Sequence, residues 1–335
     1  MPLISVVSPV FNEAACLSEL YRRLTSTLSQ LCDSYEIVLV DDGSSDDSWA
    51  RISDLSSRDP RVRGVRFSRN FGHHLSISAG LDFAIGDWVI VMDSDLQDQP
   101  ESIPALYAKA LEGFDTVLAC RSVRRDSWVK RLTSHGFYKV YASLTDTTYD
   151  AQAGVFRIMS RRVVDALRQM RESNRFFPGL VDWVGFSRSR IFVEHARRFA
   201  GETKYPLRRQ FLLALNTILS FSDKPLFYVM YLGLIMSTLS LTYGLYIIGL
   251  ALAGKVVIMG YASLASAIFF VGGFAVFAIG IVGIYVGRIF RQVQGRPLYI
   301  IAQTCGADAD PVRASDIVCR NVIKGAGEVV GVPRR

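Results

Sequence analysis

The 335-residue sequence predicts an α/β domain with a mostly parallel sheet, followed by an interfacial helix and two transmembrane helices. Two observations lead to this fold class. Short apolar runs alternate with a helical pattern over residues 1–160, and two long uncharged runs follow after residue 225. Alternating strands and helices are typical of an open wound sheet, in which ligands bind beyond the carboxyl ends of the strands.

Five short apolar runs have the length and composition of buried, mostly parallel strands. They cover residues 4–10, 36–40, 62–67, 88–92 and 116–120. Between the first two runs, apolar residues recur at spacings of three, four and seven, which predicts a helix with one apolar face. The residues of that face are Leu17, Leu20, Tyr21, Leu24, Leu28 and Leu31.

Residues 226–253 and 256–287 contain no charged side chain. Each run is longer than the roughly 20 residues that cross a bilayer. Arginines and lysines flank the pair on both sides, whereas only Lys255 lies in the connection. Because positive flanks stay in the cytoplasm, we expect a plasma-membrane protein with two spans, and with both termini and the catalytic domain inside. The alternative is a pair of buried core helices.

Residues 206–222 carry an apolar helical face just before the first uncharged run, which predicts a helix in the membrane interface or, alternatively, an ordinary core helix. The expected domains are therefore 1–205 (catalytic), 206–224 (juxtamembrane helix), 225–288 (two spans) and 289–335 (cytoplasmic tail). In the second span, Gly280, Gly283 and Gly287 form a small-residue face that permits a homo-oligomer, a dimer or tetramer.

The net charge of +7 does not indicate nucleic acid. Basic residues beside a membrane are explained by anionic lipids and phosphate-bearing substrates. Zinc-finger spacing and RNA-binding aromatic motifs are missing from the sequence, so we expect no nucleic-acid partner. The five cysteines form no C-x-x-C pair, which argues against a disulfide framework and a structural zinc site.

An acidic run, Asp93, Ser94, Asp95, Leu96 and Gln97, follows the fourth predicted strand. Oxygen ligands of this kind suit Mg²⁺ or Mn²⁺, and Mg²⁺ usually completes its shell with water and substrate phosphates. The pattern therefore points to a bound nucleotide diphosphate. Taken alone it is equally compatible with a solvated acidic loop.

Polar, aromatic and turn-forming residues also follow the first three predicted strands. They are Phe11, Asn12 and Glu13, then Asp41, Asp42 and Gly43, then Ser68, Arg69, Asn70, Phe71 and Gly72. An Asp-Asp-Gly run alone is more often a turn than a ligand. Because the carboxyl ends of parallel strands meet at one edge, we expect all four segments to converge there.

With these motifs the sequence resembles the inverting GT-A glycosyltransferases of family two, and more closely the polyprenyl-phosphate glycosyltransferases. The resemblance covers residues 3–303. The resemblance rests on five short sequence motifs: DSDLQD at 93–98, RNFG at 69–72, GVFR at 154–157, RFAGETK at 198–204, and GRPLY at 295–299.

The resemblance implies a GT-A fold and a set of site residues. Those for the nucleoside are Pro9, Phe11, Glu13, Val40 and Asp42, and those for the metal are Asp93, Asp95 and Gln97, with Ser94 beside the donor. Catalytic roles fall on Asp95, Asp150, Arg157, Arg121 and Arg131, and phosphate-binding roles on Lys130, Arg198 and Lys204. The alternative interpretation of any one of these basic residues is an ordinary solvated surface charge.

One position departs from the family pattern. Close relatives commonly carry an Asp after the glycine that corresponds to Gly154, and this Asp is proposed as a catalytic base, whereas this chain has Val155. Asp150 lies nearby in the sequence. The chemistry tolerates such a loss, because a phosphate monoester with a second pKa near 6 is already largely dianionic at pH 7.

The expected function is metal-dependent, inverting transfer of one sugar from a nucleotide sugar to a polyprenyl phosphate, such as undecaprenyl phosphate, at the cytoplasmic face of the membrane. A UDP-linked donor such as UDP-glucose is expected. Two alternatives stay open: a processive polysaccharide synthase, whose Gln-x-x-Arg-Trp motif is missing here, and a non-catalytic nucleotide-binding scaffold.

Overall fold

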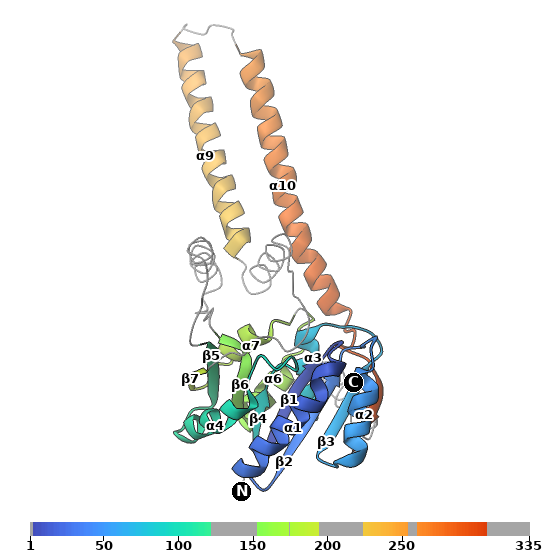
Figure 1. The fold of residues 1–335 in the computed structure, drawn as a ribbon. Helices are drawn as coiled ribbons and strands as arrows, with labels where there is room; N and C mark the ends of the chain where they lie inside the picture. The colour runs from blue at the N-terminus through green and yellow to red at the C-terminus, as the bar shows by residue number, and fades with distance from the viewer. Residues whose placement is uncertain (1–2, 122–152, 174, 194–223, 254–259, 307–335) are drawn as a thin grey trace, which may run out of the picture. The chain divides into compact units, whose positions relative to one another are not determined.

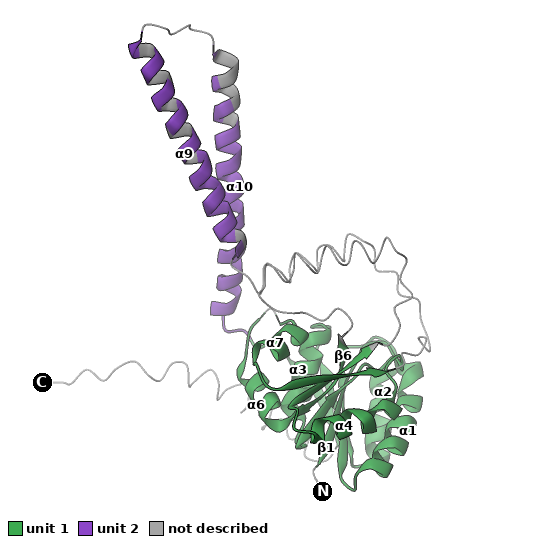
Figure 2. Ribbon diagram, turned by 90° about the vertical axis from the view of Figure 1, so that its left-hand side faces the viewer, with its two compact units in different colours: residues 1–139, 147–206, 297–335 green, residues 140–146, 207–296 purple. Residues whose placement is uncertain are grey.

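The computed structural model describes residues 3–121, 153–173, 175–193, 224–253 and 260–306 (Figure 1). The chain divides into two compact units (Figure 2). Unit 1 comprises Met1–Lys139, Thr147–Pro206 and Pro297–Arg335, and unit 2 comprises Val140–Asp146 and Leu207–Arg296.

The described strands of unit 1 form one eight-stranded sheet in the order β7-β5-β6-β4-β1-β2-β3-β8. The strands are β1 (Ile4–Val10), β2 (Tyr35–Asp41), β3 (Val62–Phe67), β4 (Trp88–Val91), β5 (Thr116–Arg121), β6 (Ala153–Ser160), β7 (Arg188–Val193) and β8 (Ile301–Cys305). Neighbouring strands β4, β1, β2 and β3 are parallel, whereas β6 is antiparallel to β4 and β5, and β8 is antiparallel to β3. The prediction of a mostly parallel α/β sheet is confirmed.

Helices cover both faces of the sheet (Figure 2). One group consists of α1 (Ala14–Leu31), α2 (Ser48–Arg58) and α4 (Ile103–Leu111). The other group consists of α3 (His73–Phe83), α6 (Arg161–Gln169) and α7 (Phe177–Trp183). A short 3-10 helix (Pro100–Ser102) precedes α4.

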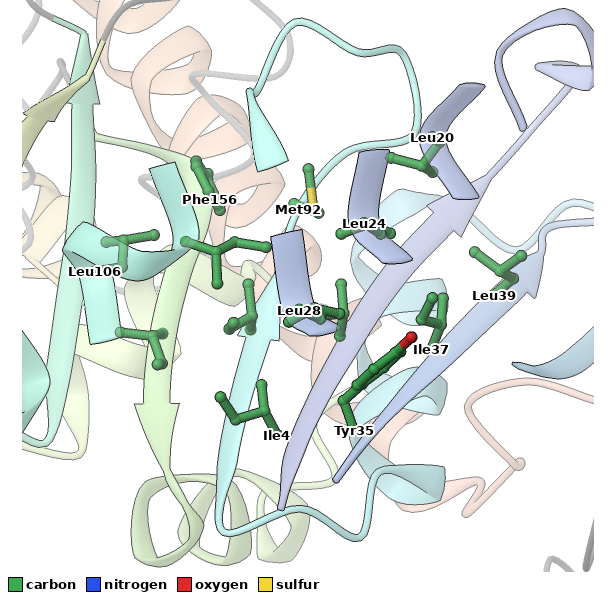
Figure 3. Close-up of a cluster of buried hydrophobic side chains, with 14 of the residues drawn as sticks. Ile4, Leu20, Leu24, Leu28, Tyr35, Ile37, Leu39, Met92, Leu106 and Phe156 are labelled. Carbon is green, nitrogen blue, oxygen red and sulfur yellow. The ribbon is translucent and has the colours of Figure 1, made fainter. Parts of the chain in front are cut away.

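The predicted apolar face of α1 faces the core. Leu20, Leu24 and Leu28 are almost completely buried, and they lie over side chains of β1 and β2 such as Ile4 and Ile37 (Figure 3). Burial of each large aliphatic side chain stabilises the fold by about 1.5–3 kcal/mol, so this helix fixes one side of the sheet.

Three strands were not predicted. β6 lies at the end of the stretch in which strands and helices were expected to alternate, and β7 lies beyond that stretch. β7 is an edge strand, on which charged residues are expected. β8 falls inside the expected tail 289–335, yet it pairs with β3 and extends the sheet. The segment directly after the last helix is therefore part of the α/β unit.

Unit 2 contains two long helices, α9 (Lys224–Leu252) and α10 (Tyr261–Val293). Within the described residues, one helix is long and apolar enough to cross a membrane: Phe270–Val293 has a mean hydropathy of 2.2, and no part of it is buried. The apolar stretch found in α9, Leu226–Met236, is shorter. The second span therefore stays a prediction, and the expected interfacial helix at 206–222 lies outside the described residues.

Candidate active site

Four loops meet at the carboxyl edge of the sheet, as the sequence predicted. Ser44 and Asn12 join the first two: the backbone N–H of Asn12 donates to Ser44 Oγ (3.0 Å), and the N–H of Ser45 donates to Asn12 Oδ1 (2.9 Å). The loops after β2 and β3 are joined by Asp42, which accepts hydrogen bonds from the backbone N–H groups of Phe71 (2.7 Å) and Gly72 (3.0 Å).

Asp42 was expected to contact the nucleoside. In the structure it is buried, and its carboxylate holds the backbone of the 69–72 loop. Burial raises its pKa, while the two backbone N–H bonds act in the opposite direction by stabilising the charged form. Asp42 is thus an organiser of the edge, and its contact with a nucleoside stays a prediction.

The residues expected around a nucleoside differ in exposure. Phe11 is 47% exposed and offers a free aromatic ring at the end of β1. The backbone of Glu13 donates to Ser48 Oγ (3.1 Å). Pro9 and Val40 are paired in the register of β1 and β2 and are buried, and Val40 packs toward Gly80 of α3. A side-chain contact from Val40 to a nucleoside would therefore require the core to open.

The acidic run forms a tight loop after β4. The N–H of Gln97 donates to Asp95 Oδ1 (3.1 Å), and both Ser94 and Asp95 are buried. Leu96 has a left-handed backbone with φ of 61° although its side chain is buried in the core. Asn12 is also left-handed, with φ of 55°. Such conformations cost on the order of 1–3 kcal/mol and cluster at functional sites.

His73 connects this acidic loop to α3. Its Nε2 lies 3.4 Å from Asp93 Oδ1. Desolvation lowers the pKa of His73, and it lowers that of the neighbouring His74 to about 4, where the charges of His73, Arg157 and Arg175 add to the effect. Both imidazoles are therefore neutral at pH 7. His73 and His74 were not among the predicted site residues, although two histidines directly after the 69–72 motif were a visible signal.

Arg157 was expected to act in catalysis. It lies in β6 opposite Val91 of β4 and is 1% exposed. Its guanidinium donates to the carbonyls of Gly154 (2.9 Å) and Val155 (3.2 Å) and lies over the Phe177 ring. Because β6 runs antiparallel to β4, the residues just before Arg157 approach the end of β4 that carries Asp93. A catalytic role of Arg157 stays a prediction.

Five of the expected site residues lie outside the described part of the chain: Lys130, Arg131, Asp150, Arg198 and Lys204. Arg121 is the last residue of β5, so its backbone ends at the same edge of the sheet as Asp41 and Val91.

Comparison with known proteins identifies the family. Residues 5–168 match the family described as Glycosyl transferase family 2. An uncharacterized glycosyltransferase of Synechocystis sp. is 40% identical over 310 residues, which are 92% of this chain and 98% of that protein. The chain belongs to glycosyl transferase family 2.

Further relatives of this glycosyltransferase carry more specific names. The bactoprenol glucosyl transferase of Shigella phage SfII is 39% identical over 302 residues, covering 90% of this chain and 98% of its own. A prophage bactoprenol glucosyl transferase homolog of Escherichia coli K12 is 38% identical over 299 residues, covering 89% and 98%. Among solved structures, glucosyl-3-phosphoglycerate synthase of Mycobacterium tuberculosis has a TM-score of 0.48 at 21% identity, over 65% of this chain and 76% of that one.

The glycosyltransferase presents a donor set that fits a divalent metal ion. No group of three His, Cys, Asp or Glu residues within the described ranges forms a complete cage. Asp93 and Asp95 lie one residue apart in one tight loop, and carboxylate oxygens are the ligands that Mg²⁺ and Mn²⁺ prefer. An incomplete protein shell suits an ion that binds together with the phosphates of its substrate.

Proposed function

We propose that this glycosyltransferase moves one sugar from a UDP-linked donor, such as UDP-glucose, to a polyprenyl phosphate such as undecaprenyl phosphate, with inversion and with Mg²⁺ or Mn²⁺. The observation that carries this proposal is the extent of similarity to the bactoprenol glucosyl transferases. It covers about nine-tenths of the chain, well beyond residues 5–168, and so reaches the long helices as well as the catalytic unit.

In the proposed reaction, a phosphate oxygen of the lipid attacks the anomeric carbon. The bond between that carbon and the donor phosphate breaks, and its electron pair leaves with the nucleoside diphosphate. One displacement of this kind inverts the anomeric centre. The acceptor phosphate is largely dianionic at pH 7, so Val155 in place of an acid is compatible with the reaction.

The side chains of the acidic loop are proposed to hold the departing end of the donor. Asp93, Asp95 and Gln97 would bind the divalent ion, which, when bound, neutralises the charge that develops on the diphosphate. Phe11 offers a surface on which a base can stack, and Asp42 holds the 69–72 loop at the same edge of the sheet. Arg198 and Lys204 are proposed to meet the lipid phosphate, and Arg121, Lys130 and Arg131 the donor phosphates.

The fold supports two membrane spans. β8 follows α10 and pairs with β3, so the chain before α9 and the chain after α10 belong to the same folded unit. A unit on one side of a membrane requires an even number of crossings between its two parts. If α10 crosses once, the 29-residue α9 crosses as well. The arginines and lysines around the pair support our proposal that the catalytic unit and both termini lie in the cytoplasm.

The topology predicts that the connection between α9 and α10 is extracytoplasmic. A cysteine introduced at Gly260 of a variant that lacks the native cysteines is expected to react with a membrane-impermeant maleimide in intact cells. A cysteine at Gln303 in β8 is expected to react only after permeabilisation. The opposite labelling of either position contradicts the two-span arrangement.

Transfer to lipid is tested with membranes that contain the full chain. With labelled UDP-glucose, undecaprenyl phosphate and Mg²⁺, we expect one labelled sugar per lipid in the organic extract, loss of the product with EDTA, and recovery with Mg²⁺ or Mn²⁺. A high-molecular-weight product identifies a processive synthase instead. If none of the common nucleotide sugars gives a lipid-linked product, the proposed function is wrong and the scaffold alternative is favoured.

A further inference from the structure

The segment directly after α10 is fastened to the catalytic unit at several points. We call residues 297–305 the strap. β8 pairs with β3 from Gly64 to Phe67, and the carbonyl of Ile300 accepts a hydrogen bond from the N–H of Ser68 (2.9 Å). The strap therefore runs alongside β3 up to the residue at which the 69–72 loop begins.

Tyr299 anchors the strap to Asp82, which lies near the C-terminal end of α3. Its ring is 6% exposed, and its hydroxyl donates to Asp82 Oδ2 (2.6 Å). Arg171 binds the same carboxylate through two nitrogens, at 2.8 and 2.9 Å. Burial and the charge of Asp82 raise the pKa of Tyr299 well above its ordinary value, so the hydroxyl keeps the proton that it donates.

A chain of aromatic rings leads from this anchor to the edge of the sheet. Tyr299 stacks on Phe67 with ring centroids 5.0 Å apart and planes at 15°. Phe67 in turn meets Phe71 edge to face at 5.6 Å. The backbone N–H of Phe71 is one of the two groups that Asp42 holds, so the ring chain ends inside the loop network of the candidate active site.

We propose that Tyr299 is a positioning residue for donor binding: through Phe67 and Phe71, the strap holds the 69–72 loop in the conformation that Asp42 captures. This inference rests on the proposed function only in that the carboxyl edge takes the nucleotide-sugar donor. The alternative is that the strap merely covers the edge of β3. The backbone pairing of β8 is sufficient to cover the edge of β3. The hydrogen bond of the buried Tyr299 hydroxyl and the stacked aromatic rings are additional to this pairing, so edge cover does not explain them.

The test uses Tyr299→Leu, which removes the stacked ring and the hydroxyl, and Tyr299→Phe, which removes the hydroxyl alone. The chain offers a matched control in Tyr21→Phe. Tyr21 donates to Asp59 (2.9 Å), and Asp59 is held by Arg61 (2.8 Å), so the chemistry is the same. Asp59 precedes β3, at the edge of the sheet opposite to the candidate active site.

In the full-length enzyme, Tyr299→Leu is expected to raise the KM for the sugar donor about tenfold while kcat changes less than about threefold, because the bound donor must reorder the loop. Tyr299→Phe is expected to give a smaller rise, because the stacked ring is retained, and Tyr21→Phe no rise. Hydrogen exchange supplies a second readout that needs no turnover: peptides covering residues 68–76 are expected to exchange at least about fivefold faster in Tyr299→Leu, with α1 unchanged.

If Tyr299→Leu is folded but leaves both the donor KM and the exchange of 68–76 unchanged, the proposal is overturned and the strap is only an edge cover. A parallel loss of protection throughout unit 1 also overturns it, because the role is then general stability. Should Tyr299→Leu fail to fold, Phe71→Leu must reproduce the KM rise for the proposal to stand. If the wild type transfers no sugar from any donor, the proposed function fails, while the exchange measurement still decides the role of the strap.

Discussion

Replacement of Asp95 by alanine is expected to lower kcat/KM for sugar transfer by about a thousandfold or more. Asp95 is buried in the loop after β4, and its Oδ1 accepts the N–H of Gln97 at 3.1 Å, so its carboxylate has a fixed position. Loss of the carboxylate removes a proposed metal ligand where negative charge leaves with the diphosphate. Steady-state transfer to undecaprenyl phosphate measures the effect.

Three comparisons sharpen this expectation. Asp95→Asn keeps the shape and an acceptor for Gln97 but not the charge, so it should lose nearly as much activity as alanine. Asp98→Asn alters a carboxylate in the same loop and should retain most activity. Asp150→Asn should weaken activity only modestly, because the acceptor phosphate carries its own charge. An equal, near-complete loss in Asp150→Asn would show that Asp150 is a base or an essential ligand.

Replacement of Gly43 by alanine is expected to disrupt the same site from the side of β2. Gly43 has φ of +68°, and an added Cβ would lie 2.5 Å from the backbone carbon of Arg69 and 2.8 Å from the nitrogen of Asn70. Backbone atoms cannot swing aside, so the loops after β2 and β3 must separate. We expect the free energy of unfolding to fall by about 2–4 kcal/mol and activity by at least about a hundredfold, because small displacements at a reacting centre are costly.

Gly113→Ala separates the clash from the cost of the backbone conformation. Gly113 also has a positive φ, +106°, but an added Cβ meets no atom within 4 Å. It precedes the amino end of β5, at the edge of the sheet opposite to the candidate site, so the expected cost is about 1–2 kcal/mol with activity unchanged in the folded fraction. Denaturant unfolding and transfer assays on both variants decide the matter. Equal effects of the two substitutions would show that close packing against Arg69 is unimportant.

Local patterns in the sequence determined the core of the catalytic unit. Leucines spaced three and four apart form one apolar helical face that packs against the core, and Leu20, Leu24 and Leu28 of α1 are buried there against the sheet. Apolar runs followed by turn residues predicted the strands β1 to β5. Because parallel strands end on one side, the convergence of Asp42, Phe71 and Asp93 at one edge also followed from the order of the motifs.

Long-range pairing, by contrast, was decided only by the tertiary structure. Tyr299 and Asp82 are 217 residues apart in the chain, and no local periodicity encodes which strand edge a distant segment joins. For the same reason β8 was assigned to a tail, and the two antiparallel or edge strands β6 and β7 were missed.

The roles of individual polar residues also depended on three-dimensional burial. In the sequence, Arg157 and Asp42 are charged residues in recognised motifs. In the structure, Arg157 is buried in β6, the strand beside β4, and the carboxylate of Asp42 accepts hydrogen bonds from the backbone of a neighbouring loop. The sequence alone thus predicted which residues carry the chemistry of this glycosyltransferase, and it determined that long apolar helices follow the catalytic unit. Only the fold decided which of these residues hold the site together, and that the chain returns to the same sheet after α10, because both depend on contacts between residues far apart in sequence.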